Sequence, residues 1–179
     1  GEKKVNNFSI EKKFNLKKNS IFKLTGIKNR FISNKGETTE KLALDVCKKL
    51  KKKDFTGVTH IIGVTNTPSI KFPGISNFVS SALNLENVHC INLNSGCTGY
   101  VDALILAYDI INSNLKSKIL IVTSDTYSKH IHKKNRNIRP LFSDGSSVSI
   151  VKFDKKGFKS FYRKTKNISG TQKDLIFKE

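Results

Sequence analysis

Hydrophobic and polar positions follow one another along this chain in a pattern that predicts short buried strands separated by helices. Three segments are apolar at most of their positions, as expected of parallel strands covered on both faces. They lie at 58–64, 88–93 and 118–124. Apolar residues recur at helical spacing over 39–52, 75–83 and 97–114. This alternation with short connections predicts an α/β fold with a mostly parallel sheet and helices on both faces.

The two ends of the chain are less regular. Residues 1–24 are polar and basic, and 25–32 has the pattern of a turn entering a strand. Near the other end, 147–153 alternates as a strand does, and 157–163 could pair with it as a hairpin. We therefore expect a five-stranded sheet. Residues 164–179 have little pattern.

The chemistry suggested by the sequence lies between a strand and the helix predicted over 97–114. There, Cys97 stands on a turn flanked by Gly96 and Gly99, at the expected start of a buried helix. Backbone N–H groups and the helix dipole at such a place stabilise a thiolate, and the same N–H groups can face an oxyanion. Cys97 is therefore the candidate nucleophile, with a buried structural cysteine as the alternative. Asn66 and Asp125 follow two other strands, at the edge where ligands gather in such sheets.

Composition narrows the class of protein. The 179 residues suffice for one domain, and no apolar run approaches the roughly 20 residues of a membrane-spanning helix. There are three cysteines, an odd number, and their spacing is not that of a metal site. Free thiols suit a reducing compartment, so we expect a cytoplasmic protein without a metal or a membrane partner.

The charge of the chain bears on its partners. Lys and Arg number 33 against 14 Asp and Glu, which gives a formal net charge of +19. The lysines are scattered and lack interleaved aromatic residues, so we do not expect nucleic acid as a partner. An acidic protein surface suits this charge equally well, and a compositional bias of the source is the alternative.

Six segments, taken in order, resemble one protein family. They are 25–30, 65–68, Phe72-Pro73, Ser95-Gly96-Cys97-Thr98-Gly99-Tyr100, 119–125 and Leu141-Phe142-Ser143-Asp144-Gly145. Together they are similar to the N-terminal half of the β-ketoacyl-acyl-carrier-protein synthase III family, within the thiolase superfamily. The cysteine turn and the later Phe-x-Asp-Gly turn carry the resemblance as a pair.

This resemblance implies a fold and an activity. The fold would be a thiolase-like half-domain over 1–163, with 164–179 as a tail or the start of a connection to a C-terminal half. The activity would be an acyl transfer in which Cys97 accepts an acyl group from a thioester. That group would then condense with a carbanion made by decarboxylating malonyl-carrier protein, in fatty acid or related acyl biosynthesis. The implied partners are an acidic acyl carrier protein or a coenzyme A thioester, the C-terminal half, and a second subunit of a homodimer; no cofactor is implied.

The resemblance also suggests substrate-binding residues. Arg136 matches an arginine that stacks on the adenine of coenzyme A, whereas Ser20 and Leu24 replace a tryptophan and an arginine of the best-studied members. An acyl carrier protein is therefore a plausible donor. Phe72 matches an apolar residue that reaches into the partner subunit's acyl pocket, or it is an ordinary core aromatic. Arg30 could hold a phosphate or the carrier surface, or form a structural salt bridge.

Other residues set limits on the expected chemistry. The family's catalytic His and Asn come from its second half, and none of the four histidines here stands in that context. We therefore expect this chain alone to accept an acyl group at most. Asp144 is predicted to form a turn, and no base is assigned at Asn66 or Thr67. The alternatives are a cysteine hydrolase pairing Cys97 with His130 or His132, and a non-catalytic binding or scaffold module of the same fold.

Overall fold

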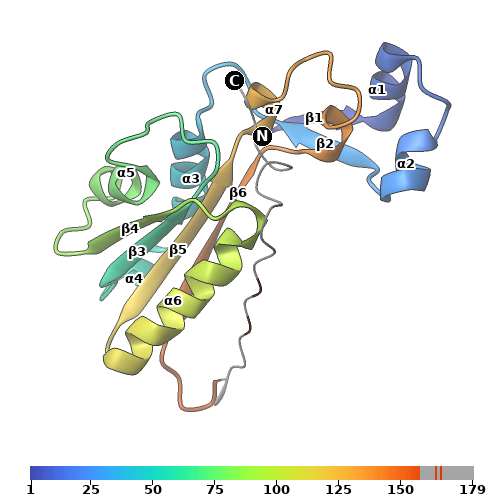
Figure 1. Cartoon of the computed structure of the whole chain (residues 1–179). Helices are drawn as coiled ribbons and strands as arrows, with labels where there is room; N and C mark the ends of the chain where they lie inside the picture. The colour runs from blue at the N-terminus through green and yellow to red at the C-terminus, as the bar shows by residue number, and fades with distance from the viewer. Residues whose placement is uncertain (158–163, 165, 167–179) are drawn as a thin grey trace.

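The computed structural model describes residues 1–157, 164 and 166. Its centre is a four-stranded sheet in the order β4-β3-β5-β6 (Figure 1). The parallel strands are β3 (His60–Val64), β4 (His89–Leu93) and β5 (Lys118–Asp125). The fourth strand, β6 (Gly145–Lys152), runs antiparallel to β5. The mostly parallel sheet predicted from the sequence is thus confirmed.

A separate two-stranded ribbon lies beyond the end of this sheet. Its strands, β1 (Lys3–Asn6) and β2 (Asn29–Ile32), pair antiparallel. Two short helices connect them, α1 (Asn7–Phe14) and α2 (Ser20–Thr25). The remaining helices are α3 (Thr39–Cys47), α4 (Lys52–Phe55), α5 (Ile75–Ala82), α6 (Gly99–Ser113) and α7 (Tyr127–His130). Two 3-10 turns complete the order, η1 (Gly96–Thr98) and η2 (Arg139–Leu141).

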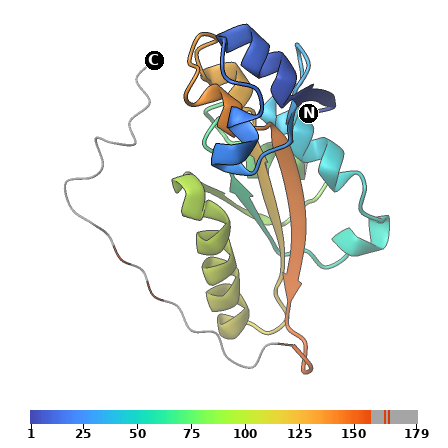
Figure 2. The ribbon, with the colours of Figure 1, turned by 90° about the vertical axis from the view of Figure 1, so that its right-hand side faces the viewer.

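The sheet has a hydrophobic core on each face because successive strand residues point to opposite sides. Ile61 of β3 packs on the face covered by α3 and α5, whereas its neighbour Ile62 packs under α6. Figure 2 shows α3 and α6 on opposite sides of the sheet. Each such isoleucine is fully buried, and burial of one contributes about 1.5–3 kcal/mol. Helices on both faces, as predicted, therefore hold β3 and β5 rigidly at the centre.

The main sheet has four strands in the described residues, and these correspond to four of the five predicted strands. The strand pattern at 29–32 forms β2, which pairs with β1 in the separate ribbon. The backbone of Phe31 has a different role, because its carbonyl accepts a hydrogen bond from Asp144 N–H at 2.7 Å. The predicted hairpin over 157–163 and the tail over 164–179 lie almost wholly outside the described residues.

The helix after the cysteine turn differs from the prediction in its start and in its burial. It begins at Gly99, and Cys97 lies in the preceding 3-10 turn. Gly99 packs against β3, since a Cβ there would come within 2.5 Å of Val64 Cγ1. Only one side of α6 is buried, through Gly99, Ala103, Ala107 and Ile111, while Val101 is 53% exposed. The expectation of a helix buried on most sides is therefore wrong in the described chain.

Among the described residues, no helix is both long enough and apolar enough to cross a bilayer.

Candidate active site

The carboxyl ends of β3, β4 and β5 meet at one edge of the sheet, where the structure brings three polar segments together. Asn66 follows β3, the η1 turn with Cys97 follows β4, and Asp125 ends β5. Hydrogen bonds join Asn66 to both of the other segments. The convergence expected from the strand order is therefore present.

Cys97 differs from the other two cysteines in its environment. All three are free, but Cys97 is exposed, Cys90 is half-buried and Cys47 is buried. Burial raises the pKa of the Cys47 thiol to about 12, which leaves it almost wholly protonated at neutral pH. Only Cys97 combines exposure with a position at the carboxyl edge of the sheet.

This difference predicts selective alkylation. At pH 8, iodoacetamide should modify Cys97 more than about tenfold faster than Cys47, because the thiolate is the reactive form and burial disfavours it at Cys47. Timed quenching followed by peptide mass mapping measures the three rates in one sample, with Cys90 as the internal comparison. Equal rates at all three cysteines would contradict the prediction.

The turn that carries Cys97 is tied to the end of β3 by one side chain. Asn66 Oδ1 accepts a hydrogen bond from Gly96 N–H at 3.0 Å, and Asn66 Nδ2 donates to the Gly96 carbonyl at 3.4 Å. Gly96 has a φ of +58°, in the left-handed region that favours glycine. Asn66 therefore contacts both backbone polar groups of the residue before Cys97.

Asp125 organises the segment from which Asn66 projects. A single carboxylate oxygen, Oδ1, accepts from Asn66 N–H at 2.8 Å and from Thr67 N–H at 3.0 Å. The same oxygen accepts from the hydroxyl groups of Thr67 at 2.8 Å and Thr65 at 3.1 Å. Asp125 thus joins the end of β5 to the exit from β3.

Tyr127 also belongs to this site, although no motif in the sequence pointed to it. Its ring lies 4.7 Å from that of Phe142, centroid to centroid. Burial raises the pKa of Tyr127, and the nearby charges of Asp125 and Cys97 raise it further, while a hydrogen bond with the Asn66 side chain opposes the shift. The phenol is therefore within electrostatic range of Asp125 and Cys97. Its position two residues after Asp125 was the only available signal.

Asp144 is a buried cross-link, and the turn predicted for it is not formed, because residues 142–144 are an irregular segment between η2 and β6. Its side chain is 2% exposed and accepts from the N–H groups of Ser33 and Ser128, both at 2.8 Å. The hydroxyl groups of both serines donate to it as well. Burial alone would raise the pKa of this carboxyl, but the hydrogen bonds from Ser128 and Ser33 hold it below its ordinary value. Asp144 therefore connects the ribbon, α7 and the start of β6.

Known proteins resemble this chain in sequence. A family model described as 3-oxoacyl-[acyl-carrier-protein (ACP)] synthase III matches residues 91–166, the part that contains Cys97. A β-ketoacyl-[acyl-carrier-protein] synthase III of Staphylococcus epidermidis is 34% identical over 157 residues, covering 86% of this chain and 48% of that protein. One of Fusobacterium nucleatum is 32% identical, covering 85% of this chain and 47% of that protein.

The same family appears among solved structures. A β-ketoacyl-[acyl-carrier-protein] synthase III of Thermus thermophilus superposes with a TM-score of 0.82 at 29% identity, covering 88% of this chain and 50% of that one. In sequence and in fold, this chain matches half of a β-ketoacyl-acyl-carrier-protein synthase III. The resemblance stated from the motifs is confirmed. The chain spans about half the length of the curated relatives it matches.

Arg30, which the synthase III resemblance suggested as a substrate-binding residue, lies in the interior of the structure. Its side chain is 1% exposed, and Nη2 donates to Asn7 Oδ1 at 2.9 Å. Nε and Nη1 are buried and have no hydrogen-bond partner among the described residues. Burial lowers the pKa of Arg30. Such burial does not suit contact with the surface of a carrier protein.

Phe72 and Arg136, the other residues suggested by the synthase III resemblance, lie on loops. Phe72 is 88% exposed in the loop before α5, and Arg136 is exposed in the loop between α7 and η2. No hydrogen bond or ring contact joins either side chain to Cys97 within the described part of the chain. Their exposure leaves both available to a ligand or a second subunit.

None of the histidines contributes to this edge of the sheet. His60 and His89 stack on each other at the amino ends of β3 and β4, with ring centroids 5.6 Å apart. His130 and His132 are exposed, and neither forms a hydrogen bond with Cys97 in the described residues. A cysteine–histidine hydrolase pair therefore has no geometric support. The described residues also contain no group of three or more His, Cys, Asp or Glu side chains that could hold a metal.

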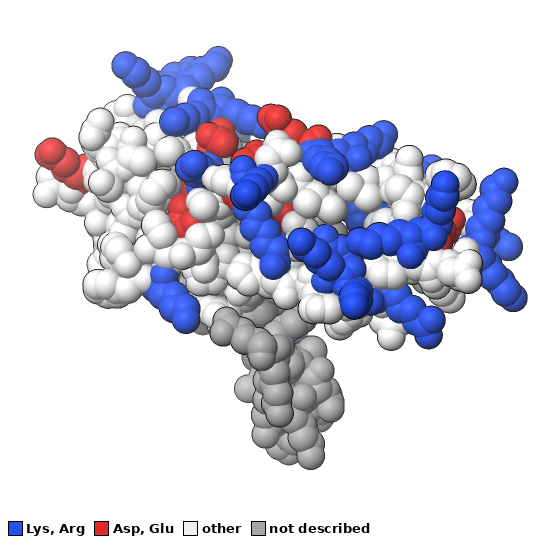
Figure 3. All heavy atoms as spheres, turned by 90° about the horizontal axis from the view of Figure 1, so that it is seen from above, with Lys and Arg blue, Asp and Glu red and all other residues white. Residues whose placement is uncertain are grey.

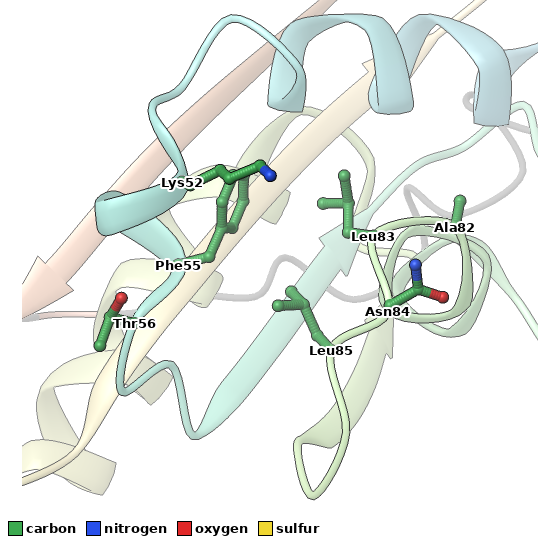
Figure 4. A pocket seen from close by; sticks show the side chains of 7 residues that line it. All are labelled: Lys52, Phe55, Thr56, Ala82, Leu83, Asn84 and Leu85. Atoms are coloured by element: carbon green, nitrogen blue, oxygen red, sulfur yellow. The ribbon is translucent and has the colours of Figure 1, made fainter.

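One hollow in the described surface lies away from the cysteine turn. Its volume is about 540 Å³, and it lies between α4 and the end of α5 (Figure 4). Phe55, Leu83 and Leu85 form an apolar floor, and Lys52 stands at the rim. Because no cysteine, histidine or carboxylate lines it, this hollow contains none of the groups that acyl transfer requires.

Proposed function

We propose that this chain is the acyl-accepting half of a 3-oxoacyl-[acyl-carrier-protein] synthase III, with Cys97 as the nucleophile. The observation that carries the proposal is the exposed Cys97 on a tight turn at the carboxyl edge of a parallel sheet, within the segment that matches the family. The relatives are named as synthases of this type. Their names support the reaction class, and the exposure and position of Cys97 support its sulfur as the reacting atom.

The proposed first step is a thioester exchange. The Cys97 thiolate attacks the carbonyl carbon of an acyl thioester, a new S–C bond forms, and the donor's thiolate leaves and takes up a proton. The negative charge on the tetrahedral intermediate needs backbone N–H donors about 2.7–3.1 Å from the oxyanion, and the Cys97 N–H is the donor we assign. Covalent catalysis of this kind divides one difficult transfer into two easier ones.

The second step is the condensation. Decarboxylation of malonyl-carrier protein releases CO₂ and leaves a carbanion, which attacks the Cys97 thioester and regenerates the thiolate. The His and Asn that the family resemblance implies for this step have no counterpart among residues 1–179. Condensation therefore requires groups contributed from outside this sequence.

The charge distribution supports an acidic carrier protein as the partner. Figure 3 looks onto the end of the molecule where the parallel strands finish, and basic side chains gather there over α1 and α2. This group comprises the exposed lysines Lys12, Lys13, Lys17, Lys18, Lys23 and Lys28. Complementary charge accelerates the encounter of two proteins and orients them.

We also propose a homodimer in which Phe72 reaches the partner subunit.

Acyl labelling tests the function. The complete protein is incubated with acetyl-coenzyme A or an acyl carrier thioester, and its intact mass is measured. We expect one acyl increment in the wild type and in Cys90→Ala, and none in Cys97→Ala. An increment that persists in Cys97→Ala would overturn the assignment. Carrier binding without any increment would favour the non-catalytic alternative.

A further inference from the structure

The contact between Asn66 and Gly96 has a form that few side chains can make. An amide group offers a donor and an acceptor side by side, so it can bond to the N–H and the C=O of one residue together. Asn66 does so at 3.0 and 3.4 Å, respectively. A carboxylate would lack the donor, and a hydroxyl is too small to span both backbone groups.

Within the cysteine turn, the other hydrogen bonds are local. Thr98 N–H donates to the Ser95 carbonyl at 3.3 Å, and the single hydrogen of the Thr98 hydroxyl can be donated either to that carbonyl at 2.8 Å or to Asp102 Oδ2 at 2.9 Å. These bonds shape the turn but do not attach it to the sheet. Asn66, 30 positions earlier in the chain, provides an attachment to the end of β3.

The Asn66 side chain is itself held in place from β5. Its backbone N–H donates to Asp125 Oδ1 at 2.8 Å, and the neighbouring Thr67 donates twice to that oxygen. An uninterrupted set of contacts therefore runs from β5 through Asn66 to the residue before Cys97.

We propose that Asn66 is a positioning residue for Cys97. It holds the Gly96 backbone, so that the Cys97 thiol and the Cys97 N–H keep a fixed relative position. Asp125 in turn holds Asn66. This inference rests on the proposed function of Cys97 as the acyl acceptor. The oxyanion donor must lie within a few tenths of an ångström of its place, and a displacement of about 1 Å can cost about 100-fold in rate. As a neutral amide, Asn66 acts through the backbone and transfers no proton.

The test compares two reactions of Cys97 in the complete protein. Acylation by an acyl thioester uses the oxyanion donor, whereas alkylation by iodoacetamide does not. In Asn66→Ala we expect the single-turnover acylation rate, followed by intact mass, to fall about 100-fold. The plateau rate of alkylation at alkaline pH should change less than about threefold, because the thiolate stays accessible.

A second variant adds a readout that a merely structural role would not move. Asn66→Asp keeps an acceptor for Gly96 N–H, but it loses the donor and places a carboxylate beside the turn. Asp125, Asp102 and the phenol of Tyr127 already lie around this segment. The added charge opposes the thiolate, so the pH at which alkylation reaches half its plateau should rise.

Asn92→Ala is the matched control. The Asn92 side chain makes a similar two-point contact, accepting from Ser76 N–H at 2.9 Å and donating to the Pro73 carbonyl at 3.3 Å, but it holds the start of α5. It should lower thermal stability without the 100-fold loss of acylation.

The outcomes separate this inference from the proposed function. If Asn66→Ala acylates at the wild-type rate while Cys97→Ala does not acylate, Asn66 does not position Cys97 and the function stands. If the wild type acquires no acyl group, the proposed function fails. The pH profile of Cys97 alkylation then decides by itself whether Asn66 positions Cys97. An unchanged profile in Asn66→Asp would then overturn the inference.

Discussion

Replacing Asp144 by alanine should lower the free energy of unfolding by about 3–4 kcal/mol at pH 7. The side chain is almost wholly buried and accepts from two backbone N–H groups and two hydroxyls. Alanine leaves these four donors without their acceptor, and hydrogen bonds to charged groups contribute about 1.5–3 kcal/mol each before compensation. Urea unfolding followed by circular dichroism measures the loss.

The pH dependence of this effect has a definite sign. Because the hydrogen bonds hold the pKa of Asp144 below its ordinary value, their contribution is present above about pH 4 and declines as the pH falls through the lower pKa of the folded state. The difference in the free energy of unfolding between the wild type and Asp144→Ala should therefore become smaller at acid pH. Asp154→Asn is the control, since Asp154 is exposed and accepts from Lys156 N–H in a surface turn. Equal losses in the two variants would contradict the assignment.

Gly63→Ala should destabilise the protein by about 1–3 kcal/mol through steric overlap. Gly63 lies in the middle of β3, where a Cβ would come within 2.4 Å of Ile75 Cγ2 and 2.9 Å of Ser76 N. The second of these atoms belongs to the backbone of α5, so the helix or the strand must move. That movement would also disturb the hydrogen bond from Ser76 N–H to Asn92 Oδ1. The shift in thermal midpoint measures the cost.

Gly145→Ala provides the matched comparison. This glycine begins β6, and a Cβ there would meet no atom within 4 Å. Its backbone does not adopt the left-handed conformation that requires glycine. We expect a change within about 0.5 kcal/mol. If Gly63→Ala proved as mild as Gly145→Ala, the close approach of α5 to β3 would not be tight in solution.

Local patterns in the sequence were sufficient for the central elements. The predicted strands at 58–64 and 118–124 and the helix after the cysteine turn are present as β3, β5 and α6. The two strands are rich in apolar residues and the helix has a clear helical period, and burial against the sheet reinforces what each segment favours locally. The order of the strands also placed Cys97 at the carboxyl edge, because parallel strands must end together there.

Weaker local signals left other features to the tertiary structure. The segment at 29–32 has a strand pattern, but the pattern does not say which partner it pairs with, and it joined β1. Apolar residues on most sides of α6 predicted that the helix would be buried all round, but only one side of it is buried in the described chain. Arg30 gave no sign that it would be buried, since arginine is mostly an exposed residue.

The sequence by itself determined the α/β class, the central strands, the position of the cysteine turn and the family to which its motifs are similar. Only the tertiary structure decided which side chains serve that turn. The contacts of Asn66 with Gly96 and Asp125 join positions 30 and 59 apart, and that of Ser33 with Asp144 joins positions 111 apart. Such contacts have no local pattern. They form because packing on the two faces of the sheet brings the strand ends together, and the polar groups buried there must then find partners.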